Sequence, residues 1–345
     1  MEEAEDEALE MRHMRQELKR KLFRRAPEPL RLGRFVVLER LGEGGMGVVF
    51  SGYDPTLDRK VAIKVLRSQP GELGDRQRLR TMREAQALAR LSHANVIAVF
   101  EVGELDGAVF IVMEFIRGVT LKDWLASTPR APAEVLAVLV AAGRGLVAAH
   151  QAGLIHRDFK PDNVMVGDDG SVRVLDFGLA ALEASPAEAV TEASPDFDPA
   201  SPASDRLRLT RTGVKVGTPA YMAPEQWAGA PPDARGDQYS FCAVLHEALT
   251  GVRPNAGVTL AALERAESPP RPAPRSELPA WLRAAVQRGL ARAPEQRFAS
   301  LSQLIDLLAR DPERRQRRQR AAQIVAAVML TALIALGLVR GAAAL

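Results

Sequence analysis

The pattern of hydrophobic and polar positions divides the chain into a front part of short strands and a back part of long helices. From Phe35 onward, runs rich in valine and isoleucine are separated by glycine, aspartate and proline, which is typical of strands. These runs are "FVVLERLG", "GVVFSGYD" and "KVAIKVLR". A helical stretch, "RQRLRTMREAQALARL", follows them, and "VIAVFEVGELDG" with "AVFIVMEF" then predicts a hairpin.

After "IRGVTL" the apolar spacing becomes that of helices. "LAVLVAAGRGLVAAHQAGL" and "GDQYSFCAVLHEALTG" predict two long helices, and "ELPAWLRAAVQRGLAR" and "FASLSQLIDLLAR" predict two shorter ones. We therefore expect an α+β, two-lobed fold, with a small β-rich N-lobe at 34–113 and a larger α-helical C-lobe at 119–309. The connection at 114–118 is the expected hinge, and a ligand cleft is expected near Met113 to Gly118.

Two further segments have a different composition. Residues 1–33 change from acidic to basic, and Met11, Met14, Leu18 and Leu22 recur at helical spacing, which predicts a charged helical extension. Residues 181–209 are rich in alanine, serine, proline and acidic side chains. Such a segment buries too little apolar area to order itself, so we expect a flexible insertion within the C-lobe.

The C-terminal region has the composition of a membrane anchor. Five arginines fall between Arg314 and Arg320, within the basic segment 310–320, and the nineteen residues 321–339 carry no charge. As a helix, 321–339 is about 28 Å long, close to the thickness of a bilayer's hydrocarbon core. Arginines flanking a span stay inside, so we expect a single-pass cell-membrane protein with 34–309 in the cytoplasm. The alternative is an apolar helix packed on the folded domain or on a partner.

Bulk composition excludes several other classes of protein. The net charge of +3 over 345 residues gives no electrostatic argument for a nucleic-acid partner. The single cysteine, Cys242, forms neither an internal disulfide nor a cysteine-based zinc site, and its apolar neighbours indicate a buried side chain. The chain opens on acidic residues rather than an apolar run, so no signal peptide is expected.

A glycine-rich segment, "LGEGGMGVVF", spaces Gly42, Gly44 and Gly47 as G-x-G-x-x-G. Glycines let the backbone approach phosphates closely, although the same spacing also suits a plain tight hairpin. In dinucleotide-binding proteins this spacing opens a helix. Here a strand follows, which argues against an oxidoreductase.

Three other stretches place charged groups where phosphate chemistry needs them. "HRDFKPDN", His156 to Asn163, is dense in polar groups and contains a proline, so it predicts a loop. Lys64 ends the strand "VAIK" and Glu84 lies in the following helix, so the two side chains can pair, although a surface lysine is the ordinary alternative. Asp176 ends the apolar strand in "VLDFGLA", thirteen residues after Asn163, and these two oxygen ligands suit Mg²⁺ together with phosphate.

Taken together, these stretches resemble the eukaryotic-type protein kinases. The glycine-rich loop, "VAIK", the helix glutamate, "HRD" with an asparagine five residues after its aspartate, "DFG" and "APE" occur in the order of that family's signature set. The resemblance covers about 34–309, and "EGGMGVVF" and "GTPAYMAPEQ" look most like the bacterial serine/threonine branch. It implies a bilobal kinase fold and the transfer of the γ-phosphate of ATP to proteins with Mg²⁺.

The resemblance also implies a role for each matching residue. Asp158 accepts the proton of the substrate hydroxyl, Lys160 steadies the transferred phosphate, and Asn163 and Asp176 hold Mg²⁺. Lys64, held by Glu84, binds the α and β phosphates. The other implied contacts with ATP come from the glycine-rich loop, from the adenine-binding positions and from the backbone of the hinge: Leu41, Gly42, Gly44, Gly47, Val49, Ala62, Met113, Glu114, Ile116 and Met165. Without the resemblance, Val49, Ala62 and Met165 are more simply explained as core residues.

Further matching positions concern the acceptor, regulation and support. Lys160 and Thr218 are placed as in serine/threonine kinases. Arg157 suits a phosphate, and Thr210 and Thr212 match activation-loop threonines, so we expect autophosphorylation between two copies of the chain. Ion pairing of Glu225 with Arg297 and bracing of the catalytic loop by Asp237 are also implied. Phe159 stands where the family pattern has leucine, an apolar exchange of small consequence.

Two other functions stay open at this stage. A pseudokinase binds nucleotide as a signalling scaffold without transferring phosphate, and intact Lys64, Asp158, Asn163 and Asp176 argue against it. A small-molecule kinase of related fold usually lacks "APE", the arginine before the catalytic aspartate and a long activation segment. Protein substrates in membrane-associated signalling are therefore the preferred expectation.

Overall fold

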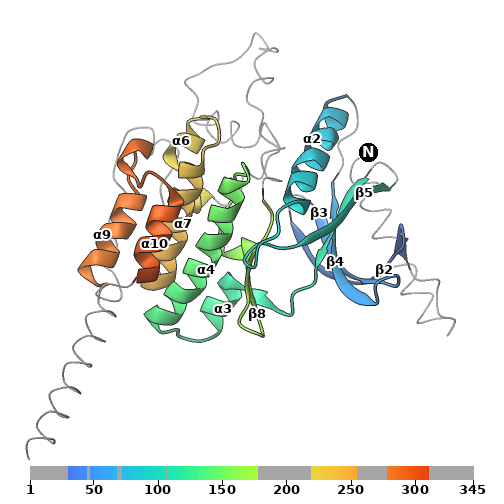
Figure 1. Ribbon diagram of the computed structural model, residues 1–345, viewed down its shortest axis with the longest axis horizontal. Coiled ribbons are helices and arrows are strands. Elements are labelled where there is room, and N and C mark those ends of the chain that lie inside the picture. Colours follow the sequence, from blue (N-terminus) through green and yellow to red (C-terminus); the bar gives the residue numbers. More distant parts are fainter. Residues whose placement is uncertain are drawn as a thin grey trace, which may run out of the picture.

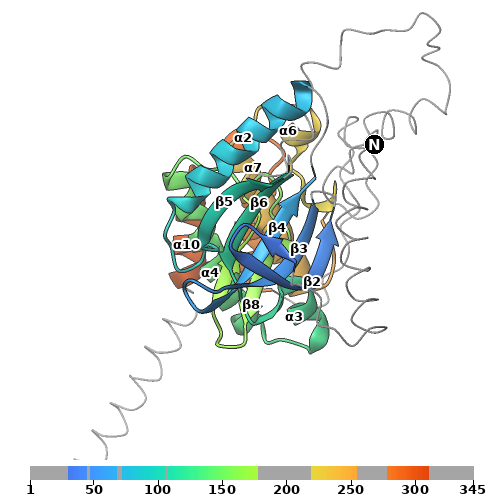
Figure 2. The ribbon, with the colours of Figure 1, turned by 90° about the vertical axis from the view of Figure 1, so that its right-hand side faces the viewer.

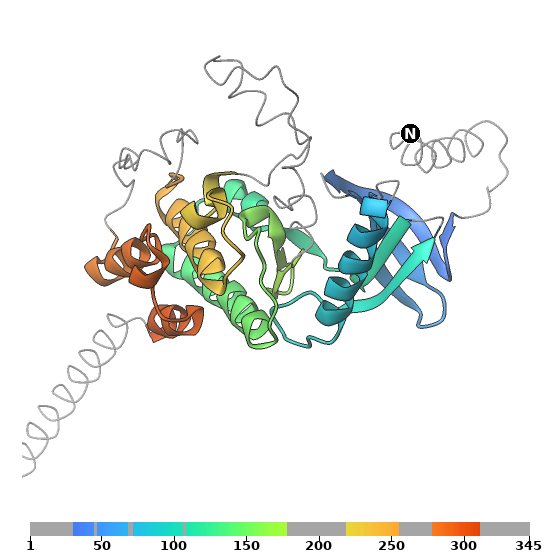
Figure 3. The same cartoon turned by 90° about the horizontal axis from the view of Figure 1, so that it is seen from above.

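The protein is described by a computed structural model that covers residues 30–44, 47–67, 72–105, 108–177, 219–254 and 278–310. Two lobes lie side by side, one built on a sheet and one on helices (Figure 1). Viewed from above, the two lobes occupy opposite ends of the folded domain (Figure 3). The α+β, bilobal fold expected from the sequence is therefore confirmed.

The N-lobe is a six-stranded antiparallel sheet with one helix. The strands are β1 (Arg31–Leu32), β2 (Phe35–Gly44), β3 (Gly47–Asp54), β4 (Arg59–Leu66), β5 (Val99–Leu105) and β6 (Ala108–Glu114), in the order β1-β2-β3-β4-β6-β5. Helix α2 (Glu72–Ala89) lies beside the β5 and β6 end of the sheet (Figure 2). The predicted β5–β6 hairpin is confirmed, and α2 begins four residues before the predicted helix.

The two faces of the N-lobe sheet belong to different apolar clusters. One face buries a core cluster that includes Phe50, Val61 and Ile63. On the other face, Ala85 and Met82 of α2 pack against Leu66 and Ile111. Side chains alternate between faces along a strand, and Lys64 is registered opposite Ile111, so Lys64 lies on the face that α2 covers.

The C-lobe combines a small sheet with a helical body. Strands β7 (Gly118–Thr120), β8 (Val164–Gly167) and β9 (Val172–Val174) form the sheet. The helices are α3 (Leu121–Ser127), α4 (Pro132–Gln151), α6 (Pro224–Trp227), α7 (Ala234–Thr250), α9 (Ala280–Gly289) and α10 (Leu301–Arg310), with short turns η1 (Pro161–Asn163), η3 (Pro219–Tyr221) and η4 (Pro294–Gln296). The chain passes from β6 to β7 through 115–117, where the sequence predicts the hinge.

Helices α4, α7 and α10 pack around the C-lobe core. Leu139 and Leu146 of α4, Phe241 of α7 and Leu304 of α10 are fully buried in one cluster. Cys242 is buried in the same cluster, as the sequence predicts. Within the described residues, α4 alone is long and apolar enough to cross a membrane, but its apolar side chains form this core, which explains their composition.

A hydrogen-bonded seam joins the two lobes beside α4. Val174 N–H donates to the Asn95 carbonyl at 3.0 Å, and Ile97 N–H donates to the Val174 carbonyl at 3.0 Å. The Asn95 side chain adds a bond to the Val172 carbonyl at 3.0 Å. Gly145 of α4 permits this approach, since a Cβ there would lie 2.3 Å from the Asn95 carbonyl oxygen. The segment between α2 and β5 is thereby fixed to the C-lobe.

Several expectations fall outside the described residues. They are most of the N-terminal extension 1–33, the insertion 181–209, the basic segment 311–320 and the membrane helix 321–339.

Candidate functional site

The loop between α4 and β8 brings the three polar groups of "HRDFKPDN" together. Lys160 Nζ lies 2.6 Å from Asp158 Oδ2. The Asn163 side-chain nitrogen donates to the Asp158 carbonyl at 2.8 Å and lies 3.3 Å from Asp158 Oδ2. Asp158 is thus held between a cation and an amide, and its own side chain keeps 14% of its exposure. A carboxylate so placed can accept a proton from a group that approaches the loop.

Asp237 of α7 accepts hydrogen bonds from the backbone of this loop, in line with the bracing role that the resemblance implies. Its two oxygens accept the backbone N–H groups of His156 at 2.7 Å and of Arg157 at 2.8 Å. His150 Nε2, at the end of α4, donates to Asp237 Oδ2 at 2.7 Å. The Asp237 side chain is only 1% exposed, so three donors satisfy a buried charge and fix the loop backbone to two helices.

His156 is a buried, neutral support for the same loop. Its Nε2 donates to the Leu175 carbonyl at 2.8 Å, and its Nδ1 accepts the N–H of Asp158 at 3.3 Å. Only a neutral ring can both donate and accept in this way. Burial lowers the pKa of His156, and this outweighs the opposing effect of Asp237 and Asp158.

Asp176 meets Lys64 across the two lobes. Leu175 N–H donates to the Asn163 carbonyl at 2.9 Å, which places Asp176 just beyond β9 and beside the loop from His156 to Asn163. Lys64 Nζ lies 2.8 Å from Asp176 Oδ1, and the lysine side chain is 5% exposed. Burial by itself raises the pKa of Asp176. The charge and hydrogen bond of Lys64 act in the opposite direction, and the pKa lies below its ordinary value, so the carboxylate stays ionised.

Glu84 has a different partner from the one that the resemblance implies. The resemblance implies that Glu84 holds Lys64, but Lys64 is paired with Asp176 instead. Glu84 Oε1 lies 3.3 Å from Arg157 Nη1. The physical reason is that each carboxylate lies against a different cation, Asp176 against Lys64 at 2.8 Å and Glu84 against Arg157 at 3.3 Å. The expected pair is therefore replaced by two pairs that each join the lobes.

The predicted adenine-binding positions share one face of the N-lobe sheet. Val49 is registered opposite Lys64, and Ala62 opposite Met113, so all four side chains point the same way. Met165 lies in β8 of the C-lobe, opposite Thr120 of β7. Leu41 is exposed at the far end of β2. Both lobes thus supply apolar groups beside the Lys64–Asp176 pair.

The three glycines of the loop differ in what the fold requires of them. Gly47 has φ 147°, and a Cβ there would lie 2.0 Å from the Val65 carbonyl oxygen, so only glycine fits. Gly42 and Gly44 have open space where a Cβ would stand. The fold itself needs no glycine at these two positions, which is consistent with close approach of a ligand.

The hinge is fixed by contacts from both lobes. Glu114 N–H donates to the Ala98 carbonyl at 2.9 Å, and the Glu114 carboxylate pairs with Arg173 of β9 at 3.2 Å. Gly118 has φ 157°, with a Cβ position 2.2 Å from the Val166 carbonyl oxygen. Ile116, the other predicted hinge contact, lies between these two anchors.

Glu225 and Arg297 form the predicted ion pair in the C-lobe. Arg297 Nη1 and Nη2 donate to the two Glu225 oxygens at 2.6 and 2.7 Å. The fully buried guanidinium also donates to the carbonyls of Arg235 and Ala291, both at 2.8 Å, and of Arg292 at 3.1 Å. Such a paired and fully bonded charge is stable inside a protein.

Asn163 and Asp176 fit a magnesium ion that phosphates also bind. The Asn163 nitrogen is used by Asp158, so its oxygen remains as a ligand beside the Asp176 carboxylate. In the part of the chain that the structure describes, no three His, Cys, Asp or Glu side chains group as an all-protein metal site would need. One carboxylate, one amide and phosphate oxygens are what Mg²⁺ uses in phosphate chemistry.

Sequence reasoning missed three residues that position the site: His150, Arg173 and Gln226. Each acts through a contact with a residue more than fifty positions away. Nothing in the local sequence marks such a contact. Thr210, Thr212 and Thr218 lie outside the described residues.

Comparison with known proteins supports the resemblance to protein kinases. Residues 35–324 match the protein kinase domain family. The chain is 41% identical over 226 residues to the serine/threonine-protein kinase PknL of Mycobacterium tuberculosis, covering 65% of this chain and 51% of PknL. It is 37% identical over 280 residues to PknB of the same species, covering 79% of this chain and 42% of PknB.

A match to Pkn1 of Myxococcus xanthus is 35% identical over 288 residues and covers 80% of this chain and 38% of Pkn1. The chain thus spans about half the length, or less, of these curated relatives. Among solved structures, the PknI kinase domain of M. tuberculosis superposes with a TM-score of 0.60 at 30% identity, covering 82% of this chain and 98% of that domain. The chain therefore belongs to the protein kinase family, and within it to the bacterial serine/threonine kinases of eukaryotic type.

Proposed function

We propose that this chain transfers the γ-phosphate of ATP to serine and threonine hydroxyls of proteins, including its own. The observation that carries the proposal is the meeting of the Lys64–Asp176 pair with the Asp158–Lys160–Asn163 group. One lobe supplies a cation for phosphate oxygens, and the other supplies a base, a second cation and two oxygen ligands. Family membership and the bacterial serine/threonine kinases it resembles support the same activity.

Asp158 is assigned as the group that orients the acceptor. The acceptor hydroxyl hydrogen-bonds to the Asp158 carboxylate and gives up its proton there as its oxygen bonds to the γ-phosphorus. The bond from that phosphorus to the β–γ bridging oxygen breaks, and ADP leaves. Lys160, already 2.6 Å from Asp158, offsets the negative charge on the transferred group.

Nucleotide binding is assigned to the residues around Lys64. Lys64 binds the α and β phosphates beneath the glycine-rich loop, and Asn163 and Asp176 hold Mg²⁺, which neutralises charge on the phosphates when bound. The adenine lies between Val49 and Ala62 on one side and Met165 on the other. Leu41 and Met113 bound this space, and the backbone of Glu114 and Ile116 reads the edge of the base.

Phosphorylation of the activation segment is proposed to raise activity. Arg157 suits a phosphate because its guanidinium forms two parallel bonds, yet here it is paired with Glu84. A phosphate on Thr210 or Thr212 brings roughly −1.5 to −2 charges and competes for Arg157. Glu84 is then released toward Lys64. Two copies of the chain phosphorylate each other, and Thr218, which matches the threonine of serine/threonine kinases in sequence, favours serine and threonine acceptors.

Membrane attachment is proposed from the sequence of the C-terminal region. The basic segment 310–320 lies on the cytoplasmic side, and 321–339 crosses the cell membrane once as a helix. The kinase domain, 34–309, then acts in the cytoplasm in membrane-associated signalling, with 1–33 as an appendage. Recovery of the full-length chain in a high-speed supernatant without detergent would contradict this assignment.

A turnover assay tests the proposed activity directly. The full-length chain is incubated with radiolabelled ATP, Mg²⁺ and myelin basic protein as acceptor, and transfer to the acceptor and to the chain is counted. We expect phosphoserine and phosphothreonine in both. A pseudokinase binds ATP without transfer, and a small-molecule kinase turns ATP over without labelling protein.

A further inference from the structure

Gln226 of α6 makes two hydrogen bonds to segments that lie far apart in the sequence. Its Nε2 donates to the Arg157 carbonyl at 3.2 Å, and its Oε1 accepts the Ala223 N–H at 3.0 Å. Chemistry fixes the orientation of this amide, because a carbonyl can only accept and a backbone N–H can only donate. Gln226 therefore connects the "APE" segment to the catalytic loop.

The Arg157 carbonyl belongs to the peptide bond that leads into Asp158. Arg157 has φ 69°, a left-handed conformation that is uncommon for a residue with a side chain. Its N–H is held by Asp237 Oδ1 at 2.8 Å and its carbonyl by Gln226. Asp237 of α7 thus holds the peptide bond before Arg157, and Gln226 of α6 holds the peptide bond between Arg157 and Asp158. The orientation of this second peptide bond determines the direction in which the Asp158 side chain leaves the backbone.

We propose that Gln226 is a positioning residue, which sets the orientation of Asp158 through the Arg157–Asp158 peptide bond. The inference rests on the proposed function and names a residue that the kinase signature does not include. It also gives the activation segment a direct route to the catalytic loop, since Gln226 follows Glu225 at the end of that segment. Glu225 itself is anchored to Arg297, so the support is rigid.

A purely structural role for Gln226 is the competing explanation. Its bond to Ala223 N–H satisfies a backbone donor at the start of α6, as the third residue of a capping box does. Glutamate serves that capping role at least as well. Glutamate cannot donate to the Arg157 carbonyl, however, and would place two acceptors against each other. The Gln226→Glu variant therefore separates the two roles.

The test compares Gln226→Glu and Gln226→Met with the wild-type full-length chain, with ATP, Mg²⁺ and myelin basic protein as the probe substrates. We expect both variants to lower kcat about 10-fold to 100-fold, with the KM for ATP within twofold of wild type, because a small displacement of a reacting group is costly. Melting temperature confirms folding. If only Gln226→Met is impaired, or if Gln226→Glu keeps kcat within twofold, the bond serves to cap α6 and the proposal is wrong.

A second measurement does not depend on turnover, so it separates this inference from the proposed activity. Hydrogen exchange of the catalytic-loop peptide 154–162 reports how firmly its backbone is held. Gln226→Glu should speed exchange there several-fold while leaving the α4 peptide 135–149 unchanged. Unchanged exchange at 154–162 would overturn the inference even if the wild-type chain transfers no phosphate. Absence of wild-type transfer would instead overturn the proposed function.

Discussion

Glu84 pairs with Arg157, and this ion pair joins helix α2 of the N-lobe to the loop of the C-lobe that carries Asp158. The carboxylate and guanidinium lie 3.3 Å apart, and both side chains are about one-fifth exposed. Lys64, the partner that the kinase resemblance assigns to Glu84, pairs with Asp176 instead. Under the proposed activation mechanism, Glu84 and the phosphorylated activation segment compete for Arg157.

Removing Arg157 should uncouple activity from the activation threonines. Thr210→Ala with Thr212→Ala should lower wild-type activity at least several-fold, because the phosphate that captures Arg157 is lost. In an Arg157→Ala background the same double substitution should change activity less than twofold. Initial rates of the four proteins give the coupling directly. Arg173→Ala is the control background, in which the double substitution should act as it does in wild type. An equal effect of the double substitution in the wild-type and Arg157→Ala backgrounds would contradict the competition for Arg157.

Asp158→Asn should nearly abolish phosphoryl transfer while ATP still binds. The proposed function assigns Asp158 to the acceptor and not to the nucleotide, and one positioned acid–base group is worth roughly 10²–10⁴ in rate. Turnover and ATP binding by calorimetry separate the two effects. Asp162→Asn is the matched control, since Asp162 lies in the same loop but pairs with Lys122 at its exposed edge. Retention of more than about a tenth of wild-type turnover would remove Asp158 from its role.

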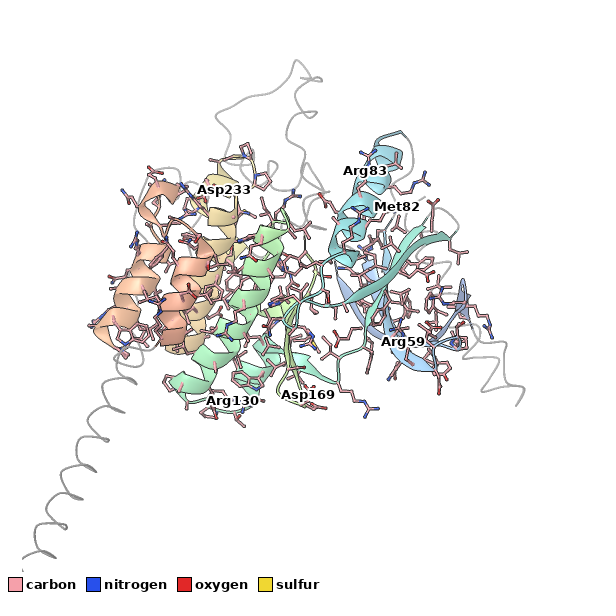
Figure 4. All side chains as sticks on the ribbon, in the orientation of Figure 1. Arg59, Met82, Arg83, Arg130, Asp169 and Asp233 are labelled. Atoms are coloured by element: carbon pink, nitrogen blue, oxygen red, sulfur yellow. The ribbon has the colours of Figure 1, made fainter. Side chains whose placement is uncertain are left out.

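Asp237→Asn should destabilise the domain far more than Asp233→Asn. Asp237 is buried and accepts three hydrogen bonds, and an asparagine there must present its NH₂ group to a donor. The expected loss is roughly 3 kcal/mol in the free energy of unfolding. Asp233 caps the start of α7, where Figure 4 labels it, and asparagine caps equally well. Urea denaturation measures both, and similar losses would show that the bonds to Asp237 add little.

Cys242 should be unreactive in the folded protein. Burial raises the pKa of its thiol to about 12, well above the ordinary value near 8.5. At pH 8 a thiol reagent should label the native chain slowly and the guanidinium-denatured chain rapidly, to one equivalent, because this is the single cysteine. Rapid labelling of the native chain would mean that the α7 core opens readily.

The same pKa gives Cys242 a defined effect on stability. Above about pH 8.5 the unfolded thiol loses its proton while the folded thiol keeps it, so stability falls as pH rises toward 12. Cys242→Ala should lack this part of the pH dependence, whatever its effect at pH 7. Unfolding free energies at pH 7 and pH 10 for both proteins measure the difference. Identical pH dependence would show that the thiol is accessible to water before unfolding.

Much of the site could be predicted because its residues come in short contiguous stretches. Asp158, Lys160 and Asn163 are close in sequence, and a loop that holds them must bring them close in space. Asp176 was predictable because it lies two residues beyond β9, and the neighbouring strand β8 begins directly after Asn163. The β5–β6 hairpin and the long helices follow from apolar spacing in the same local way.

The remainder depends on which of several partners a charge selects. Glu84 of α2 contacts Arg157 rather than the expected Lys64, and sequence spacing does not contain the position of α2 that decides the partner. Figure 4 labels Met82 and Arg83 of the same helix, where Met82 packs toward the sheet and Arg83 is exposed. The spacing of apolar residues along α2 predicts which face of the helix is buried, but it does not predict the position of the helix along the sheet. His150 and Gln226 were missed because their partners come from other elements.

The seam between Asn95 and Val174 determines how the two lobes can move. The lobes are connected at two places, the chain segment 115–117 and the hydrogen bonds of the seam. A line through these two connections is an axis about which one lobe can rotate. Rotation about this axis preserves the seam's hydrogen bonds, whereas sliding one lobe past the other would break them. Displacement then grows with distance from the axis, so Ile97, which is bonded at the seam, should move least. If nucleotide enters between the lobes as proposed, the cleft opens by rotation about this seam, where Gly145 leaves room for the Asn95 carbonyl oxygen.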